Sequence, residues 1–442
     1  MKIQLSDHFT FSRLFRFTLP SIAMMIFTSI YSIVDGLFTS NFAGKIPFAA
    51  INLIMPLVML FSGLGFMFGT GGSALVSKYL GEGKAEKAKR TFSFIVYFAF
   101  GFGILSSVGF YFAVPPVARL LGAEGEILHY AVLYARTLSV GVAAFMLQSI
   151  FQSFMIAAEK PHLGFVLTLA AGCTNIVLDA LFIGVFKWGV VGAAIATDAS
   201  YVVGGIVPLV YFFVKRNGTL SLGKTHFDLK SLAKTVTNGS SELMTNISSS
   251  IVGMLYNVQL LKYAGVDGVA AYGVIMYVGF IFVAIFIGYS MGTAPVVSFN
   301  YGSENKKELT NIFRKSLQIV AVVSLCMFAA SEVAAGILAS IFTGYDEQLF
   351  ALTKRAFRLY SFGFLICGVN IYGSSFFTAL NNGIVSALLA FVRTLVFQVS
   401  CILLFPVLLG ANGIWLAFPS SEILTAILTA VCFLIFRKRY GY

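Results

Sequence analysis

The chain has 442 residues, of which 58% are hydrophobic and only 11% are charged, and its mean hydropathy is +0.89. A soluble domain carries roughly 25% charged residues, so this composition excludes a water-soluble globular protein. Apolar runs of about 20 residues recur, which excludes an outer-membrane β-barrel and predicts an all-α polytopic membrane protein. The net charge of +12 is then expected to orient the chain in the lipid bilayer, and nucleic acid is not an expected partner.

Charged residues, together with glycines and prolines between the apolar runs, divide the chain into about twelve predicted transmembrane helices. In chain order they lie near residues 14–41, 47–77, 91–113, 130–158, 162–186, 190–214, 235–261, 268–299, 312–343, 353–380, 384–409 and 412–436. The first apolar run is too long for the core of a cleaved signal peptide. The five cysteines all lie inside apolar runs, where they pack as small apolar side chains.

Lysine and arginine are concentrated in alternate connections between these helices. The rich set comprises Lys2, Arg13, Arg16, the stretch KYLGEGKAEKAKR at 78–90, Lys215, Arg216, Lys224, Lys230, Lys234, Lys306, Lys307, Arg314, Lys315, Arg437, Lys438 and Arg439. Because cytoplasmic loops carry the excess of basic residues, both termini are predicted to lie in the cytoplasm of a multi-pass cell-membrane protein.

The two halves of the sequence repeat at an offset of 221 residues. NFAGKIPFAAINLIMP from Asn41 matches KYAGVDGVAAYGVIMY from Lys262, and GGSALVSKYLG from Gly71 matches GTAPVVSFNYG from Gly292. The repeat predicts two parallel six-helix lobes, residues 1–214 and 235–442, joined by a basic cytoplasmic linker at 215–234. Parallel repeats of this kind are typical of transporters that work by alternating access. We expect the chain to act as a monomer.

Acidic residues inside the membrane are costly and mark functional sites. From the basic edges of their helices, Asp35 and Asp179 are predicted roughly 28 Å and 26 Å from the cytoplasmic side, and Thr197 roughly 15 Å from the outside. Asn175 lies four residues before Asp179 and so shares its face. This set offers hard oxygen donors, which suit Na⁺ or a shared proton. Asp198 neighbours Thr197, and it either joins the set or faces another helix.

The second half serves as an internal control for this cluster. At the repeat offset, Asp35 becomes Tyr256, Asp179 becomes Ser400 and Thr197 becomes Phe418. A purely structural need would have predicted acids in both halves. We therefore interpret the N-terminal cluster as functional.

Other intramembrane residues have two readings each. Glu242 either lines a central cavity and attracts a cationic substrate, or caps the start of its helix. Arg393 either contacts substrate or forms a structural ion pair with Glu422 or Glu332. Tyr256 and Met276 form an adaptable apolar substrate pocket or simply pack. Gln148 and Gln152 share a helix face and are candidates to support the cluster or the substrate, and Pro20 is a candidate hinge in the first helix.

These features resemble the multidrug and toxic compound extrusion (MATE) family, and most of all its bacterial branch with the staphylococcal multidrug efflux proteins. The resemblance rests on the twelve-span architecture, LPSIAMMIFTSIYSIVDGLFTSNFAG in the first span and TNIVLDALFI in the fifth. It implies export of cationic amphipathic drugs in exchange for Na⁺ or H⁺. It also implies a cation site in the first lobe, at Asp35, Asn175, Asp179 and Thr197, and bending of the first span at Pro20. The tenth span has no acid, only Asn370, which departs from members that use an acid there.

The predicted function is therefore a cation-coupled multidrug efflux antiporter with no cofactor besides its coupling ion. The alternative is a lipid-linked saccharide flippase of the same fold superfamily, which would need several basic residues in its cavity. An enzyme is not expected: the GxGD context of an intramembrane aspartyl protease is missing, and duplication into twelve spans has no use there.

Overall fold

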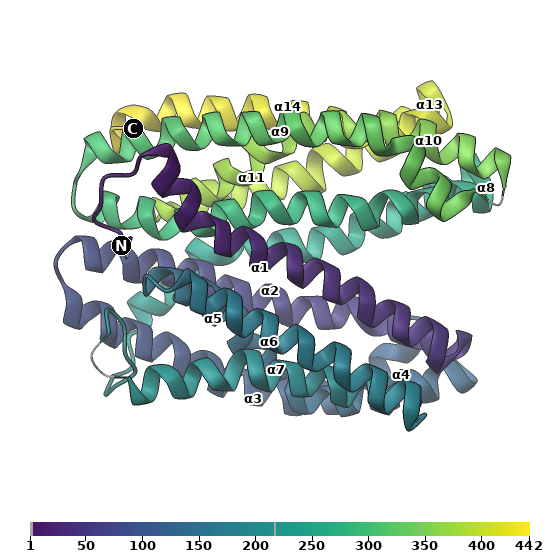
Figure 1. The fold of residues 1–442 in the computed structure, drawn as a ribbon, viewed down its shortest axis with the longest axis horizontal. Coiled ribbons are helices and arrows are strands. Elements are labelled where there is room, and N and C mark those ends of the chain that lie inside the picture. Colours follow the sequence, from purple (N-terminus) through teal and green to yellow (C-terminus); the bar gives the residue numbers. More distant parts are fainter. Residues whose placement is uncertain (1–2, 216–217, 345) are drawn as a thin grey trace.

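A computed structural model describes residues 3–215, 218–344 and 346–442. Two helical lobes lie one above the other in Figure 1, the first coloured purple to teal and the second teal-green to yellow. The first lobe contains α1 (Phe11–Phe38), α2 (Lys45–Gly81), α3 (Ala85–Leu120), α4 (Gly125–Leu138), α5 (Val142–Ala157), α6 (Pro161–Asp179) and α7 (Gly189–Val214). The second contains α8 (Leu229–Gly302), α9 (Lys306–Thr343), α10 (Glu347–Ser361), α11 (Phe364–Ala379), α12 (Gly383–Phe391), α13 (Val399–Leu409) and α14 (Ala411–Tyr440). We call them the N-lobe and the C-lobe.

The described residues form helices and no strand, and ten helical segments are long and apolar enough to cross a membrane. One of them, α8, runs through 74 residues and breaks at Gly265, where φ is 65° and ψ is −158°. At 1.5 Å per residue such a segment is long enough to cross a bilayer twice. Helices α10 and α11 form one bent span with an angle of 46°. Counting α8 as two spans and the α10–α11 pair as one gives the twelve predicted spans. This confirms the polytopic helical fold.

The linker predicted at 215–234 is shorter in the structure, because α8 begins at Leu229. Asp228 caps the helix: its Oδ1 accepts hydrogen bonds from the backbone N–H of Lys230 at 3.0 Å and of Ser231 at 3.1 Å. Hydrogen bonds from Ser231 lower the pKa of the Asp228 carboxyl. Lys2 and positions 216–217 of the linker lie outside the described residues.

Both chain termini lie at the same end of the molecule, at the left of Figure 1, and we call it the terminal end. At this end the two lobes meet backbone to backbone. A Cβ atom added to Gly81 of α2 would overlap the carbonyl oxygen of Phe299, and one added to Gly302 of α8 would overlap that of Lys78. These two contacts are related by the 221-residue offset. The internal repeat thus produces two pseudo-symmetric close contacts between the lobes. We call these contacts, at Gly81 and Gly302, the glycine seam.

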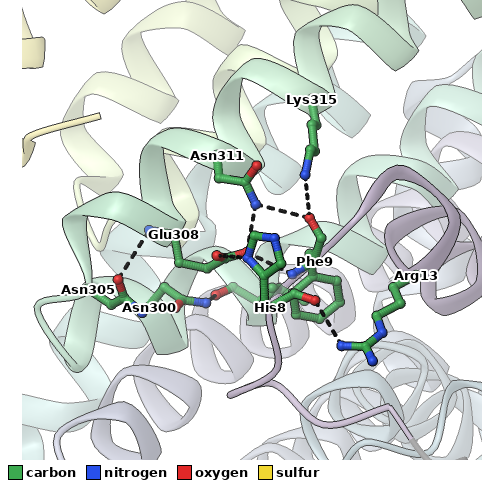
Figure 2. A network of polar contacts seen from close by, with 9 residues as sticks. His8, Phe9, Arg13, Asn300, Asn305, Glu308, Asn311 and Lys315 are labelled. Carbon is green, nitrogen blue, oxygen red and sulfur yellow. Dashed lines mark hydrogen bonds and ion pairs between the residues drawn. The ribbon is translucent and has the colours of Figure 1, made fainter.

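The segment before α1 adds a second connection at the terminal end (Figure 2). The backbone N–H of Phe9 donates to Glu308 Oε1 of the C-lobe at 2.8 Å, and Lys315 Nζ donates to the Phe9 carbonyl at 2.7 Å. His8 Nδ1 lies 2.6 Å from Glu308 Oε2. On the other side, the N–H of Leu5 donates to Glu159 Oε1 of the N-lobe at 2.9 Å. The N-terminal segment thus fastens both lobes together.

The seam predicts the effect of a single methyl group. In a cysteine-free background, Gly302→Ala should increase the rate at which a maleimide labels Thr18→Cys several-fold, because the added Cβ forces the lobes apart. Thr18 is fully buried, and its methyl group faces Gly292 of α8 across the same interface.

Gly101→Ala in α3 is the matched control, because a Cβ there meets no atom within 4 Å. Equal labelling rates in the Gly302 and Gly101 variants would contradict the prediction that an added Cβ at Gly302 forces the lobes apart.

Candidate functional site

Four of the predicted cation ligands lie on neighbouring helices of the N-lobe. Asp35 comes from α1, Asn175 and Asp179 from α6, and Thr197 from α7. Asp179 is fully buried and Asn175 is 1% exposed. The carboxyl groups of Asp35 and Asp179 face each other closely enough to interact directly. The structure therefore joins two acids that lie 144 positions apart in the sequence.

The polar atoms of this cluster are unusually poor in protein partners. Within the described part of the chain, Asp35 Oδ1, both carboxylate oxygens of Asp179 and both polar side-chain atoms of Asn175 are buried without a hydrogen bond. The Thr197 hydroxyl donates to the Ala193 carbonyl at 2.9 Å, so its lone pairs remain free to accept. Buried carboxylates normally have a charged or hydrogen-bonding partner. This arrangement suits a small cation or a proton that completes the set.

The helices change geometry next to both acids. A π-helical turn, Thr39–Ala43, follows α1, and the Thr39 hydroxyl donates to the Asp35 carbonyl at 3.0 Å. A second π-helical segment, Ala180–Val185, begins directly after Asp179. Such turns are rare in proteins and are frequent at functional sites. Both were missed in the sequence, because no residue pattern distinguishes a π-helical turn from an α-helical one.

Three tyrosines surround the acids and were also missed. Tyr31 lies one turn before Asp35 on α1 and near Gln148 of α5. Tyr134 of α4 lies within electrostatic range of Asp35, Asp179 and Asp198. Tyr201 of α7 stacks on Phe145, with ring centroids 4.2 Å apart. The i, i+4 spacing of Tyr31 and Asp35 was a usable signal for the first of these.

Asp198 occupies a neighbouring position with a different environment. Its Oδ1 lies against Gly141, in the short 3₁₀ turn between α4 and α5, where a Cβ atom would overlap the carboxylate. The residue therefore faces another element, one of the two readings of the sequence, while staying near Tyr134.

The supporting residues of the N-lobe are buried. Gln148 is 3% exposed and Gln152 is 6% exposed, both on α5. Gly204 of α7 leaves the space that the Gln148 side chain fills. Pro20 is buried inside α1, which the structure shows as one helix over Phe11–Phe38.

The C-lobe contains an ion pair between Arg393 and Glu422, the first of the two acids considered as its partner. Glu422 Oε1 accepts from Arg393 Nε at 2.9 Å and lies 2.7 Å from its Nη2. Asn370 Nδ2 donates to Glu422 Oε2 at 2.7 Å, and the Thr429 hydroxyl donates to Asn370 Oδ1 at 3.2 Å. The Glu422 side chain is 1% exposed and that of Arg393 is 18% exposed. Arg393 therefore forms the structural pair with Glu422.

The other residues singled out in the second half of the sequence are Glu332, Tyr256, Met276 and Glu242. Glu332 pairs with Arg358 at 3.6 Å instead of Arg393. Tyr256 is fully buried and stacks on Tyr272 with centroids 4.7 Å apart, while Met276 is half-buried beside the Tyr360 hydroxyl. Glu242 lies on α8 next to Leu243 and Asn246, which pack on Gly63 of α2. Glu242 is thus at the interface between the lobes, and no described cation pairs with it.

Two cavities lie away from these residues. One of 740 Å³ is lined by α3 and α4, including Arg119, His129 and Arg136. The other, of 760 Å³, lies at the terminal end and is lined by both lobes, including Lys78, Lys306 and Arg439. The described residues contain no group of three or more His, Cys, Asp or Glu side chains that could hold a metal ion. With two carboxylates, the N-lobe cluster suits a monovalent cation or a proton.

Comparison with known proteins now identifies the family. The model of the MatE family matches residues 20–181 and 243–403, one block in each lobe. The chain belongs to the MatE family. Its similarity to MATE transporters predicted from the sequence is thereby confirmed.

Among the relatives of this MatE protein are staphylococcal multidrug export proteins called MepA. The protein of Staphylococcus saprophyticus is 27% identical over 366 residues, which cover 81% of each chain. That of Staphylococcus aureus (strain MRSA252) is 24% identical over 437 residues, covering 97% of this chain and 94% of the relative. A crystal structure of a MATE transporter in the straight conformation shares the fold, with a TM-score of 0.91, 24% identity and coverage of 97% and 95%.

The Arg393–Glu422 pair predicts a specific pattern of stability in this MatE protein. Arg393→Met should lower the free energy of unfolding by about 3–5 kcal/mol, because it leaves a buried carboxylate uncompensated. The double variant Arg393→Met/Glu422→Gln should recover most of this loss. Thermal unfolding of the purified protein in detergent checks both, and a double variant as unstable as the single one would contradict the interpretation.

Proposed function

We propose that this MatE protein is a cation-coupled efflux antiporter, which exports cationic amphipathic compounds in exchange for Na⁺ or H⁺. The observation that carries the proposal is the Asp35–Asp179 pair, which has no fixed counter-ion among the described residues. The MepA relatives, described as multidrug export proteins, support the export of small-molecule drugs. Export by a membrane transporter requires no catalytic residue, and we assign none.

The coupling step is neutralisation of the carboxyl pair. Two close carboxylates in a low-dielectric interior cannot both stay ionised without a cation between them or a proton on one of them. Asn175 Oδ1 and the Thr197 hydroxyl supply the further oxygen ligands that Na⁺ would need. Occupancy therefore changes how tightly α1, which carries Asp35, can pack on α6, which carries Asp179.

Helix α1 carries this change to the interface between the lobes. On one side, Gly172 of α6 is so close to Phe27 and Tyr31 of α1 that a Cβ atom would overlap Phe27. On the other side, Gly288 and Gly292 of α8 pack directly on Ile22 and Thr18 of α1. A shift of α1 near Asp35 thus alters contacts with the C-lobe. Pro20 lies within the second contact region, between Thr18 and Ile22, and is the proposed bending point.

The proposed cycle is alternating access between the two lobes. We assign the terminal end to the cytoplasm, because its loops carry the basic residues. The glycine seam and the N-terminal segment then close the cytoplasmic side in this conformation. Drug and cation must compete or prefer opposite conformations for one to drive the other. Glu242, at the lobe interface, is the proposed contact for a cationic drug, with Met276 as an apolar contact.

The flippase alternative is not favoured by the side chains. A pyrophosphate-bearing lipid would require several unpaired basic residues inside the membrane. Arg393 is the strongest such candidate, and Glu422 already neutralises it.

Efflux of ethidium from proteoliposomes tests the proposal. Under an imposed Na⁺ or pH gradient, wild-type protein should transport, and Asp35→Asn and Asp179→Asn should each lower the rate at least tenfold because the coupling ion loses a ligand.

Glu86→Gln is the matched control, because Glu86 is a largely exposed acid outside the cluster and its variant should transport normally. Transport that survives both aspartate substitutions would refute the N-lobe coupling site. Transport of a lipid-linked saccharide without drug efflux would favour the flippase.

Orientation is testable by itself. Green fluorescent protein fused after Tyr442 should fluoresce in bacterial cells, because that domain folds in the cytoplasm, and alkaline phosphatase at the same position should be inactive. The opposite pair of results would reverse the assignment of the terminal end.

A further inference from the structure

The two lobes each contain one acid and one tyrosine at the same pair of repeat positions, in opposite order. In the N-lobe these positions hold Asp35 and Tyr201. At the 221-residue offset, the C-lobe holds Tyr256 and Glu422. The structure places the members of each pair within electrostatic range of each other. The C-lobe thus has a buried carboxylate that corresponds to the N-lobe site, but it comes from α14 rather than from the first helix of the lobe.

The surroundings of the two carboxylates differ in one decisive respect. Both oxygens of Glu422 have partners: Oε1 contacts Arg393, and Oε2 accepts from Asn370. In the N-lobe, the repeat position of Arg393 is Gly172, and Phe27 and Tyr31 of α1 occupy the space beside it. A side chain as long as arginine therefore has no room next to Asp35 and Asp179. The C-lobe carboxylate is therefore paired with a cationic side chain, whereas no basic side chain among the described residues pairs with Asp35 or Asp179.

We propose that Arg393 is a resident cation that closes the carboxylate site of the C-lobe and so confines the exchangeable monovalent cation to the N-lobe. Arg393 acts as a positioning residue: it contacts Glu422 rather than the coupling ion. The inference rests on the proposed function, because it assumes that the N-lobe carboxylates bind the coupling ion. It adds that this transporter has one exchangeable cation site and that removal of the guanidinium opens a second.

The chemistry of the C-lobe site supports the claim that removal of the Arg393 guanidinium opens a second cation site. Without Arg393, Glu422 Oε1 would be a free buried carboxylate oxygen. The Tyr256 hydroxyl is buried without a hydrogen bond among the described residues and lies in range of Glu422. The Glu422 carboxylate and the Tyr256 hydroxyl thus offer oxygen donors of the kind that a monovalent cation or a proton requires.

The test counts cations bound by the purified full-length protein in detergent. The probes are ²²Na⁺ at fixed pH and, in parallel, proton uptake in weakly buffered solution, and the probe that wild-type protein binds is carried forward. Wild type should bind one cation, and Asp35→Asn should bind none. Adding Arg393→Gln to Asp35→Asn should restore one bound cation, and adding Glu422→Gln to that double variant should abolish it again. Arg393→Lys, which keeps the charge, should restore no binding in the Asp35→Asn background.

A second arm does not depend on the folding of a protein with an unpaired Glu422. Arg393→Gln/Glu422→Gln in an otherwise wild-type chain removes both charges and should still bind one cation. A loss of binding there would show that Glu422 exchanges cations itself and would overturn the inference, as would a folded Asp35→Asn/Arg393→Gln variant that binds nothing. Retention of wild-type binding by Asp35→Asn would instead refute the proposed N-lobe site, so the two failures are distinguishable.

Discussion

The structure depends on two neighbouring carboxylates in the N-lobe that have no basic partner among the described residues. Asp35 on α1 and Asp179 on α6 face each other, and Asn175 and Thr197 add neutral oxygens. Such a pair is stable only when a cation or a proton neutralises it. The free energy of that neutralisation is available to hold α1 in one position, and this makes α1 the natural connection between ion binding and movement of the lobes.

The contacts of α1 and the glycine seam give that movement a mechanical basis. Glycines at Gly81 and Gly302 allow the lobes to meet backbone to backbone at the terminal end, and Gly288 and Gly292 allow α1 to do the same with α8. Contacts this close cannot deform gradually, so the interface is either closed or separated. The N-terminal segment, held between Glu159 and Glu308, adds polar contacts to the closed arrangement.

Much of this could be predicted from the sequence. Long apolar runs and a repeat offset of 221 residues indicate twelve helices in two lobes. Bilayer thickness sets the length of each apolar run, and duplication makes the two halves similar in sequence. Asp35 and Asp179 became candidates because intramembrane acids are rare, and Asn175 became one because it lies four residues before Asp179. The sequence did not predict the π-helical turns or the positions of Tyr134 and Tyr201 around the acids. It also did not predict that Arg393 pairs with Glu422 rather than with Glu332. These features depend on how helices rotate and pack, which a residue pattern in one helix does not specify.

The central claim is that the Asp35–Asp179 pair links cation binding to drug binding. It is tested most directly by measuring the affinity of the purified protein for ethidium, by fluorescence, over a range of Na⁺ concentrations at fixed pH and a range of pH at fixed salt. If one cation competes with one drug, the apparent Kd should rise about tenfold for each tenfold increase in the coupling cation at high occupancy. In the Asp35→Asn variant, the apparent Kd for ethidium should be independent of that cation. The same cation dependence in wild type and in Asp35→Asn would contradict the account.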